Sequence, residues 1–425
     1  MILGSSRCML SICAAAALLT GCGGSQPLLA PEAKQQMHTK ALPASLVYRV
    51  IHRFEEKRDG GQSVAPLISV NGVLYGTASH GGAYGFGVVF RISKSGFAKT
   101  IYSFRGGITD GAYPKAGLVD VDGTLYGTTF SGGKTAPNCN DAGYPGCGTV
   151  FAITTSGAEK VLYYFNGSNA NEYPLSGLLD VKGLLYGTAS GVVYRISTSG
   201  AEKVLYSFGP PPDGQSPGPG NLIDVNGTLY GTTTSGGASR DGTVYSVSTS
   251  GIEKVLYSFA GGSDGWLPEG GVTDVNGTLY GTTFYGGSVK CSFYGCGTVY
   301  AITTTGEEHI IHDFDGSDGA EPRAGLTDVD GTLYGTTVNG GDSSKCYDVN
   351  SRSSGCGTIF SISASGAETV LHNFTDRSDG ANPKATLLNL NGTLYGTTEY
   401  FRGPRLRGHD VLKPRGLGTV FALTP

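Results

Sequence analysis

Residues 117–129 read Gly-Leu-Val-Asp-Val-Asp-Gly-Thr-Leu-Tyr-Gly-Thr-Thr, residues 148–153 read Gly-Thr-Val-Phe-Ala-Ile, and residues 161–165 read Val-Leu-Tyr-Tyr-Phe. These runs are short, rich in β-branched and aromatic residues, and bounded by glycine or aspartate, which is typical of strands separated by turns. No helical period runs through them. The segment therefore predicts a unit of four short strands with a variable loop between the second and the third.

The turn between the first two strands carries a strong hairpin signal. Asparagine or aspartate followed by glycine favours a type I′ turn, because both central residues need a positive φ. The pair recurs at Asn71-Gly72, Asp122-Gly123, Asn226-Gly227, Asn276-Gly277, Asp330-Gly331 and Asn391-Gly392, while the third copy has Lys182-Gly183. The first two strands of each unit are therefore predicted to form a hairpin.

The whole unit is repeated along the chain. Its triplet Leu-Tyr-Gly begins at Leu74, Leu125, Leu185, Leu229, Leu279, Leu333 and Leu394. One small sheet cannot bury both of its faces, whereas a ring of such sheets can. We therefore expect an all-β fold, a seven-bladed β-propeller of four-stranded antiparallel blades over residues 48–425. An open β-solenoid or a string of separate small sheets is the alternative.

The two ends of the chain favour the ring. The last copy supplies only three strands and ends at residues 418–423, whereas an additional strand, residues 48–54, precedes the first copy. This additional strand resembles the fourth strand of the other units. We expect residues 48–54 to complete the last blade and close the ring, with the Gly-Leu strand of each blade nearest the axis.

The amino terminus reads as an export signal. An apolar stretch, Cys8–Leu19, follows Arg7 and is too short to span a bilayer. It ends in Leu19-Thr20-Gly21-Cys22, which resembles a bacterial lipobox. We expect residues 1–21 to be a lipoprotein signal peptide, Cys22 to carry the lipid, and residues 22–47 to be a flexible spacer. An ordinary secretory signal with a chance cysteine is the alternative.

The composition agrees with an exported all-β protein. Glycine contributes 70 residues and charged residues 15%, against about 25% in average proteins. A formal net charge of -4 gives no reason to expect nucleic acid as a partner. The expected location is the bacterial cell envelope, at the outer membrane or cell surface, with membrane contact only through the lipid anchor.

The repeated Leu-Tyr-Gly-Thr-Thr, the downstream Gly-Gly, Gly-Thr-Val-Phe and Leu-Tyr-Ser-Phe resemble the GloVer-type tandem repeat of bacterial extracellular proteins, which use a choice of anchors. The resemblance covers residues 48–425. It implies a surface location and a propeller, but no reaction, ligand or catalytic residue. A fainter likeness to quinoprotein blades is weakened because those blades use a recurrent tryptophan and this chain has only Trp266.

In antiparallel blades the long second-to-third loops share one face with the links between blades, and we call this the loop face. Six cysteines fall in three of these loops, as the pairs Cys139 and Cys147, Cys291 and Cys296, and Cys346 and Cys356. An exported protein meets an oxidising compartment, so three local disulfides are predicted. Metal ligation is the alternative, but no histidine accompanies the pairs at finger-like spacing.

The links on the loop face carry aspartates, each followed by glycine. They are Asp59, Asp110, Asp213, Asp264, Asp318 and Asp379. Aspartate before glycine is typical of turns, because its side chain caps nearby amides. A ring of carboxylates that binds calcium is the alternative, although no calcium-loop spacing supports it.

Two loops supply candidate binding residues. Tyr285, Phe293 and Tyr294 of the fifth unit offer aromatic rings for stacking on a sugar. The loop at residues 399–417 of the seventh unit is basic and suits an anionic glycan or a membrane phosphate, with candidates Tyr400, Phe401, Arg402, Arg405 and Arg407. Structural packing of aromatics and a solvated charged loop are the alternatives.

No catalytic constellation stands out, and no cofactor or metal ion is predicted. The seven histidines form no metal-binding helix pair, and neither a nucleophile elbow nor a phosphate loop is present. The sequence favours an envelope lipoprotein that binds a glycan or a protein. The alternatives are an enzyme acting on extracellular glycans, either a lyase or a hydrolase, and a purely structural envelope protein, because propeller enzymes gather catalytic groups from several blades.

Overall fold

The structure is a computed structural model. It describes residues 46–55, 59–93, 95–135, 139, 145–168, 172–342, 344, 346, 355–375, 379–400 and 417–425. The predicted signal peptide, the lipidation residue Cys22 and almost all of the predicted spacer lie outside the described residues. No helix in the part of the chain that is described has the length and apolar character needed to cross a membrane.

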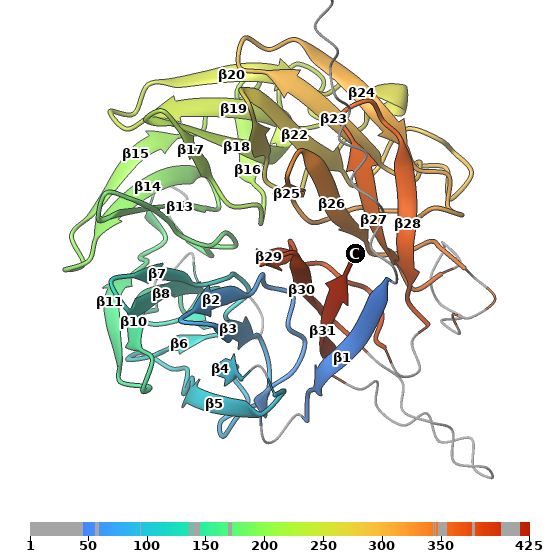
Figure 1. The fold of residues 1–425 in the computed structure, drawn as a ribbon. Coiled ribbons are helices and arrows are strands. Elements are labelled where there is room, and N and C mark those ends of the chain that lie inside the picture. Colours follow the sequence, from blue (N-terminus) through green and yellow to red (C-terminus); the bar gives the residue numbers. More distant parts are fainter. Residues whose placement is uncertain are drawn as a thin grey trace, which may run out of the picture. The chain divides into compact units, whose positions relative to one another are not determined.

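Seven antiparallel sheets, each containing the four strands of one blade, surround a common axis (Figure 1). Blade 1 has β2 (Ile68–Val70), β3 (Val73–Ala78), β4 (Val88–Ile92) and β5 (Ala98–Ser103). Blade 2 has β7 (Val119–Val121), β8 (Thr124–Thr129), β10 (Thr149–Thr154) and β11 (Glu159–Tyr164). Blade 3 has β12 (Leu179–Val181), β13 (Leu184–Ala189), β14 (Val192–Ser197) and β15 (Glu202–Ser207).

Blade 4 has β17 (Ile223–Val225), β18 (Thr228–Gly236), β19 (Thr243–Ser248) and β20 (Glu253–Ser258). Blade 5 has β21 (Thr273–Val275), β22 (Thr278–Thr283), β23 (Thr298–Thr303) and β24 (Glu308–Asp313). Blade 6 has β25 (Thr327–Val329), β26 (Thr332–Thr337), β27 (Thr358–Ser363) and β28 (Glu368–Asn373). Contacts between successive first strands, such as β17 with β21 and β21 with β25, place these strands nearest the axis, as predicted.

Blade 7 joins the two ends of the chain. It contains β29 (Leu388–Leu390), β30 (Thr393–Thr398), β31 (Thr419–Thr424) and, as its outer strand, β1 (Val47–Arg53). β1 is antiparallel to β31, with Val50 opposite Phe421 and Val47 opposite Thr424. Figure 1 shows the blue β1 beside the red β31. The ring closure predicted for residues 48–54 is therefore confirmed.

The hairpin turns adopt the predicted conformation. Asn226 and Gly227 have φ values of 55° and 84°, which a type I′ turn requires. Lys182, the one residue that departs from the asparagine or aspartate pattern, adopts the same positive φ of 54°. The hairpin turn therefore keeps the same conformation in the blade that lacks asparagine or aspartate at this position.

Aromatic rings hold neighbouring blades together. Phe104, at the end of blade 1's outer strand, packs edge-on against Phe151 of blade 2 with ring centroids 5.1 Å apart. Equivalent pairs cross the other seams: Phe165–Tyr194, Phe208–Tyr245, Phe259–Tyr300, Phe314–Phe360, Phe374–Phe421 and Phe54–Phe90. A Cβ at Gly127 of the Leu-Tyr-Gly triplet would lie 2.6 Å from the Phe151 ring, so glycine is needed there for close packing.

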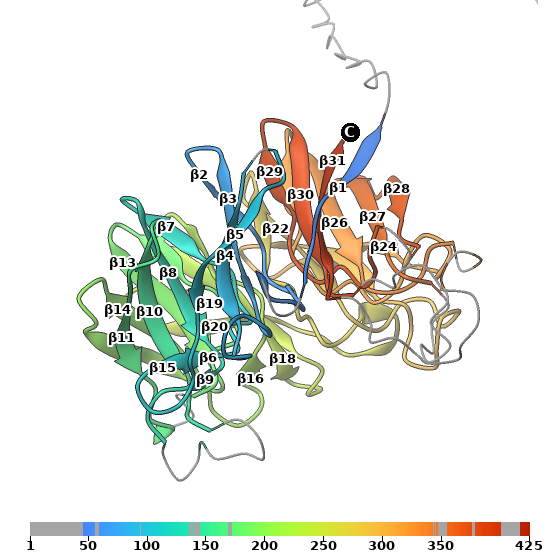
Figure 2. The same cartoon turned by 90° about the horizontal axis from the view of Figure 1, so that it is seen from below.

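The two faces of the ring differ as predicted. The links between blades pair with the starts of the second-to-third loops, as in the bridges Trp266–Tyr285 and Ala320–Asn339. The short strands β6 (Gly111–Ala112) and β9 (Ser131–Gly132) form the same pairing, and β16 (Gly214–Pro217) pairs with the extended β18. Figure 2 shows β6, β9 and β16 on the same side of the ring. Links and long loops therefore build the loop face.

Candidate functional site at the axial mouth

Each link on the loop face contains one residue with a left-handed backbone. In blade 6 this residue is Glu321, whose N–H donates to the Cys296 carbonyl at 2.7 Å and whose carbonyl accepts from the Val338 N–H at 3.2 Å. The corresponding residues, all with φ between 49° and 60°, are Gln62, Tyr113, Tyr173, Ser216, Leu267, Glu321 and Asn382. Such a conformation is unfavourable for residues other than glycine and persists where the surroundings fix it. The links are therefore held rigidly.

The residue two positions after each left-handed residue lies at the central cavity. The seven residues at this position, which we call the rim, all line a single cavity of about 910 Å³: Val64, Lys115, Leu175, Gly218, Glu269, Arg323 and Lys384. Because every blade contributes one rim residue, the cavity is the axial mouth of the loop face. A concave site of this size is suited to a small molecule or a short oligosaccharide.

Charged groups converge in this mouth. Arg323 forms an ion pair with Glu269 of the preceding blade. Lys384 forms another with Glu399, at 2.6 Å between Nζ and Oε2. The Lys115 ammonium lies 3.4 Å from the centre of the Phe130 ring, a cation–π contact. Among the described residues that line the mouth, three cations and two carboxylates thus give a formal charge of +1, although the chain as a whole has -4.

The charges influence one another across the axis. Burial, together with the Arg323 charge, lowers the pKa of Lys115. Burial raises the pKa of Glu269, although the Arg323 and Lys384 cations oppose the rise. These residues come from blades 2, 5, 6 and 7. Ionisable groups with shifted pKa values that share one cavity are typical of binding and catalytic sites.

The three predicted disulfides are present: Cys139–Cys147, Cys291–Cys296 and Cys346–Cys356. The carbonyls of Cys147, Cys296 and Cys356 accept hydrogen bonds from the left-handed residues Tyr173, Glu321 and Asn382 of the next blade. The disulfides therefore brace the loops that hold three links of the rim. Disulfides persist in oxidising compartments, so they also indicate an exported protein.

The aromatic candidates of blade 5 meet around a second, smaller cavity. Trp266, Phe293 and Tyr294 line a space of about 290 Å³. Tyr285 packs on Trp266 with centroids 4.9 Å apart and on Tyr294 at 5.5 Å. Phe293 is 93% exposed. Three of these rings are the aromatic candidates identified in the sequence, and Trp266, which was not among them, joins them from the preceding link.

Of the candidates of the seventh unit, Tyr400 is the one that lies within the described residues. Tyr400 pairs through its backbone with Ala381 in the link of blade 7. Phe401, Arg402, Arg405 and Arg407 lie outside the described residues. Among the described residues of blade 7, the rim residue Lys384 and its partner Glu399 are the charged groups that line the mouth.

The link aspartates cap their own turns. The Asp213 carboxylate accepts from the Gly209 N–H at 2.6 Å and the Tyr206 hydroxyl at 2.7 Å. Asp110 and Asp264 accept from a backbone N–H and a tyrosine hydroxyl in the same way. These hydrogen bonds favour the turn-capping interpretation over a calcium ring.

The rim residues were not among the candidates identified in the sequence. The four charged rim residues each follow a proline, in Pro114-Lys115, Pro268-Glu269, Pro322-Arg323 and Pro383-Lys384. The signal available in the sequence was this repeated pair of proline and a charged residue, since the other three copies have an uncharged residue at the same position. This pattern indicates a binding site only when the seven links are known to surround one axis.

A family model described as the Gloeobacter/Verrucomicrobia repeat matches residues 39–139, 139–349 and 189–405. No curated protein matches the chain in sequence. Among solved structures, a streptogramin B lyase is 12% identical with a TM-score of 0.54, over 89% of this chain and 97% of the lyase. Extracellular domains of two hybrid two-component systems of B. thetaiotaomicron are also similar.

The first of these two domains is 12% identical with a TM-score of 0.52, over 89% of this chain and 42% of that one. The second is 10% identical with a TM-score of 0.51, over 89% and 41%. At these identities the likeness concerns the propeller fold.

Proposed function

The chain belongs to the Gloeobacter/Verrucomicrobia repeat family, and from this premise we propose that it is an exported, lipid-anchored propeller that binds an acidic glycan in its axial mouth. The observation that carries the proposal is the convergence of Lys115, Arg323 and Lys384 from three blades on one cavity. A guanidinium and two ammonium groups suit a ligand with carboxylate groups.

The remainder of the cavity wall supports a ligand rich in hydroxyl groups. Gln62, Asn221 and Thr234 line the same space and carry neutral donors and acceptors. Glu269 and Glu399 orient two of the three cations through ion pairs. Sugar units bearing carboxylates present both kinds of group, so an oligosaccharide of uronic acids is the ligand class that fits the lining best.

The test compares acidic and neutral oligosaccharides. Isothermal titration of the purified protein should show binding of oligouronates and much weaker binding of neutral oligosaccharides of equal length. Lys115→Met should weaken oligouronate binding about tenfold or more, which corresponds to about 1.4 kcal/mol. Lys203→Met, which removes an equally charged side chain from the exposed outer strand β15, is the matched control and should bind as the unaltered protein does. Equal binding of both oligosaccharide classes would refute the proposal.

The lipid anchor is tested separately. Cys22→Ser should abolish incorporation of a labelled fatty acid and release the protein from the membrane fraction, because the lipidated cysteine of the predicted lipobox is lost. Cys13→Ser, within the predicted signal peptide, is the control and should leave labelling unchanged. Labelling that persists in Cys22→Ser would show that residue 22 is not the attachment site.

A second candidate function, a glycan lyase, is favoured by one observation. Burial lowers the pKa of Lys115 while Arg323 lies in the same cavity. In its unprotonated form Lys115 can remove the proton α to a uronate carboxylate while Arg323 neutralises that carboxylate. The bond between the β carbon and the glycosidic oxygen then breaks as the carbon–carbon double bond forms, and the leaving oxygen takes up the proton from the Lys115 ammonium. Ultraviolet absorbance of an unsaturated product would reveal this reaction. Recovery of intact oligouronate after long incubation would leave binding as the function.

A further inference from the structure

The outer seams between blades repeat one polar arrangement. In the seam between blades 3 and 4, Tyr206 of β15, Asp213 of the link and Glu253 of β20 interact. Two other seams contain Tyr102 with Asp110 and Glu159, and Tyr257 with Asp264 and Glu308. Each seam thus combines a residue from one blade, a link carboxylate and a glutamate from the next blade.

The seam between blades 5 and 6 departs from this arrangement at one position. His312 of β24 stands where the other three seams have tyrosine, while Asp318 and Glu368 keep the two carboxylates. One ligand atom from each of the three side chains lies within 4.8 Å of the others. His312 Nε2 is 3.0 Å from Asp318 Oδ2. The exchange of tyrosine for histidine therefore turns a hydrogen-bonded seam into a set of three metal-ligating groups.

We propose that His312, Asp318 and Glu368 bind a divalent transition-metal ion of the Zn²⁺ class, which links blade 5 to blade 6. An imidazole nitrogen with two carboxylate oxygens is a ligand set that zinc accepts, with water in a fourth position. Ligands about 2.1 Å from a tetrahedral ion lie roughly 3.4 Å apart, so the three ligand atoms, which lie within 4.8 Å of one another, need to approach by about 1.4 Å at most.

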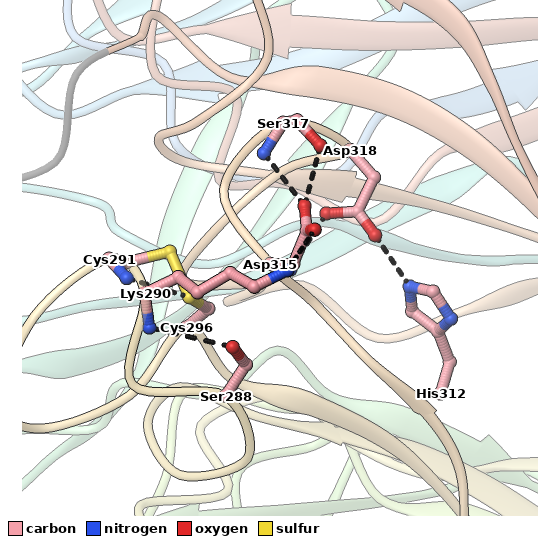
Figure 3. A network of polar contacts seen from close by, with 8 residues as sticks. All are labelled: Ser288, Lys290, Cys291, Cys296, His312, Asp315, Ser317 and Asp318. Carbon is pink, nitrogen blue, oxygen red and sulfur yellow. Dashed lines mark hydrogen bonds and ion pairs between the residues drawn. A yellow bond between two sulfur atoms is a disulfide. The ribbon is translucent and has the colours of Figure 1, made fainter.

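A neighbouring backbone N–H orients the Asp318 carboxylate. The Asp315 N–H donates to Asp318 Oδ1 at 2.9 Å, which leaves Oδ2 directed at His312. Figure 3 shows this orientation, and it shows Asp315 turned instead toward Lys290 and Ser317. Lys290 is paired with Asp315 at 2.8 Å, so this ammonium is not the partner of Asp318. Outer hydrogen bonds of this kind orient metal ligands.

One oxygen of the third ligand is available. Glu368 Oε1 is buried and has no hydrogen-bond partner among the described residues. The same is true of the equivalent glutamates at the tyrosine seams, which lack the nitrogen ligand. The seams that follow blades 6 and 7 have the histidine and the aspartate but lack the glutamate. They contain His372 with Asp379 and His52 with Asp59, but Tyr48 and Ala98 occupy the position of the glutamate.

The chain therefore supplies its own controls. Among the described residues, only the seam between blades 5 and 6 combines histidine, aspartate and glutamate. His312→Tyr recreates the side chain present at three other seams, so it should preserve the fold while removing the nitrogen ligand. His372→Tyr makes the same change at a seam without the glutamate.

The experiment is a titration of the purified, chelator-treated protein with zinc chloride. One ion per chain should bind, and excess zinc should raise the midpoint of thermal unfolding above that in a chelator. His312→Tyr and Glu368→Gln should each weaken binding at least tenfold and lose the thermal shift. His372→Tyr should retain both.

Absence of zinc binding to the unaltered protein would overturn the proposal. Undiminished binding to His312→Tyr would do so as well, as would an equal loss in His372→Tyr. Circular dichroism of each variant without metal shows whether it is folded, and Glu368→Gln provides an independent result if His312→Tyr is not. None of these outcomes depends on whether the axial mouth binds a glycan.

Discussion

Glu253 illustrates how single residues respond to the packing of the ring. It begins the outer strand of blade 4 and faces Tyr206 and Asp213 at the seam with blade 3. Burial, reinforced by the Asp213 carboxylate, raises the pKa of Glu253 to about 7, although the hydrogen bond from Tyr206 opposes the rise. The ionised glutamate therefore destabilises the folded state, because in the unfolded chain its pKa returns to near 4.5.

The sign of the pH dependence follows from proton binding. Between about pH 4.5 and 7 the folded protein binds more protons at this site than the unfolded chain, so stability falls as the pH rises. Glu253→Gln should remove this contribution and raise the free energy of unfolding at pH 8 by on the order of 1 kcal/mol, allowing for solvent screening, with little change at pH 4.5. Denaturant unfolding at the two pH values measures the difference.

Glu307→Gln is the control for this prediction, because Glu307 is exposed in the adjacent turn of blade 5. It should show no such gain at pH 8. A Glu253→Gln variant that is equally stabilised at both pH values would contradict the proposed role of ionisation.

At the scale of single elements, the disulfide loops connect the periphery of the loop face to its axis. Cys291–Cys296 closes a short loop in blade 5. The same loop carries Tyr294, whose carbonyl accepts from the Trp266 indole at 3.3 Å, and Cys296, whose carbonyl holds Glu321 in its left-handed conformation. Opening this loop should therefore disturb both the aromatic cavity and the link that precedes Arg323.

The only tryptophan of the chain reports on this disturbance. Replacing both cysteines, Cys291→Ala with Cys296→Ala, should shift the Trp266 emission to longer wavelength, because the indole gains access to water. It should also reduce the free energy of unfolding by about 2 kcal/mol, the value expected for so short a loop. Fluorescence spectra and denaturant unfolding give the two results.

The disulfide of blade 6 offers the matched comparison. Replacing Cys346 and Cys356 by alanine removes a bond of the same kind away from Trp266. Stability should fall there too, while the emission spectrum stays unchanged. An unaltered spectrum in the blade 5 variant would mean that the aromatic cavity is held together without its disulfide.

At the scale of the whole molecule, the fold was predictable from the sequence because each blade carries its own local signals. Asn226-Gly227 specifies a hairpin, and Gly127 makes room for Phe151. The axial mouth was not predictable in the same way. Lys115 and Arg323 are separated by four copies of the repeat and come to line the same cavity only when the ring closes.

The zinc seam illustrates a second limit. His312 and Glu368 lie in the outer strands of adjacent blades, more than fifty residues apart, so no local metal-binding motif marks them. The repeat itself contained the available signal, since histidine replaces tyrosine at an equivalent position. Recognising that position as a seam requires knowing which faces of neighbouring sheets are in contact.

The stability of the ring should depend on β1, which completes blade 7. Removing residues 47–54 should leave β31 as an unpaired edge and expose Phe421 and Leu423, which are buried in the ring. Such a protein should aggregate or lose cooperative unfolding. Removing residues 23–45 instead is the control and should leave the unfolding transition unchanged, because these residues precede β1.

β1 should pair with β31 equally well when it is attached to the carboxy terminus of the chain. Val47 lies opposite Thr424, so an Asn-Gly turn between Pro425 and Leu46 would make β31 and β1 a continuous hairpin like those between the third and fourth strands elsewhere. A permuted protein that begins at Glu55 and ends with residues 46–54 should therefore unfold cooperatively, with a thermal midpoint near that of the natural order. If the protein that lacks residues 47–54 unfolded cooperatively with an unchanged thermal midpoint, the pairing of β1 with β31 would not be what closes the ring.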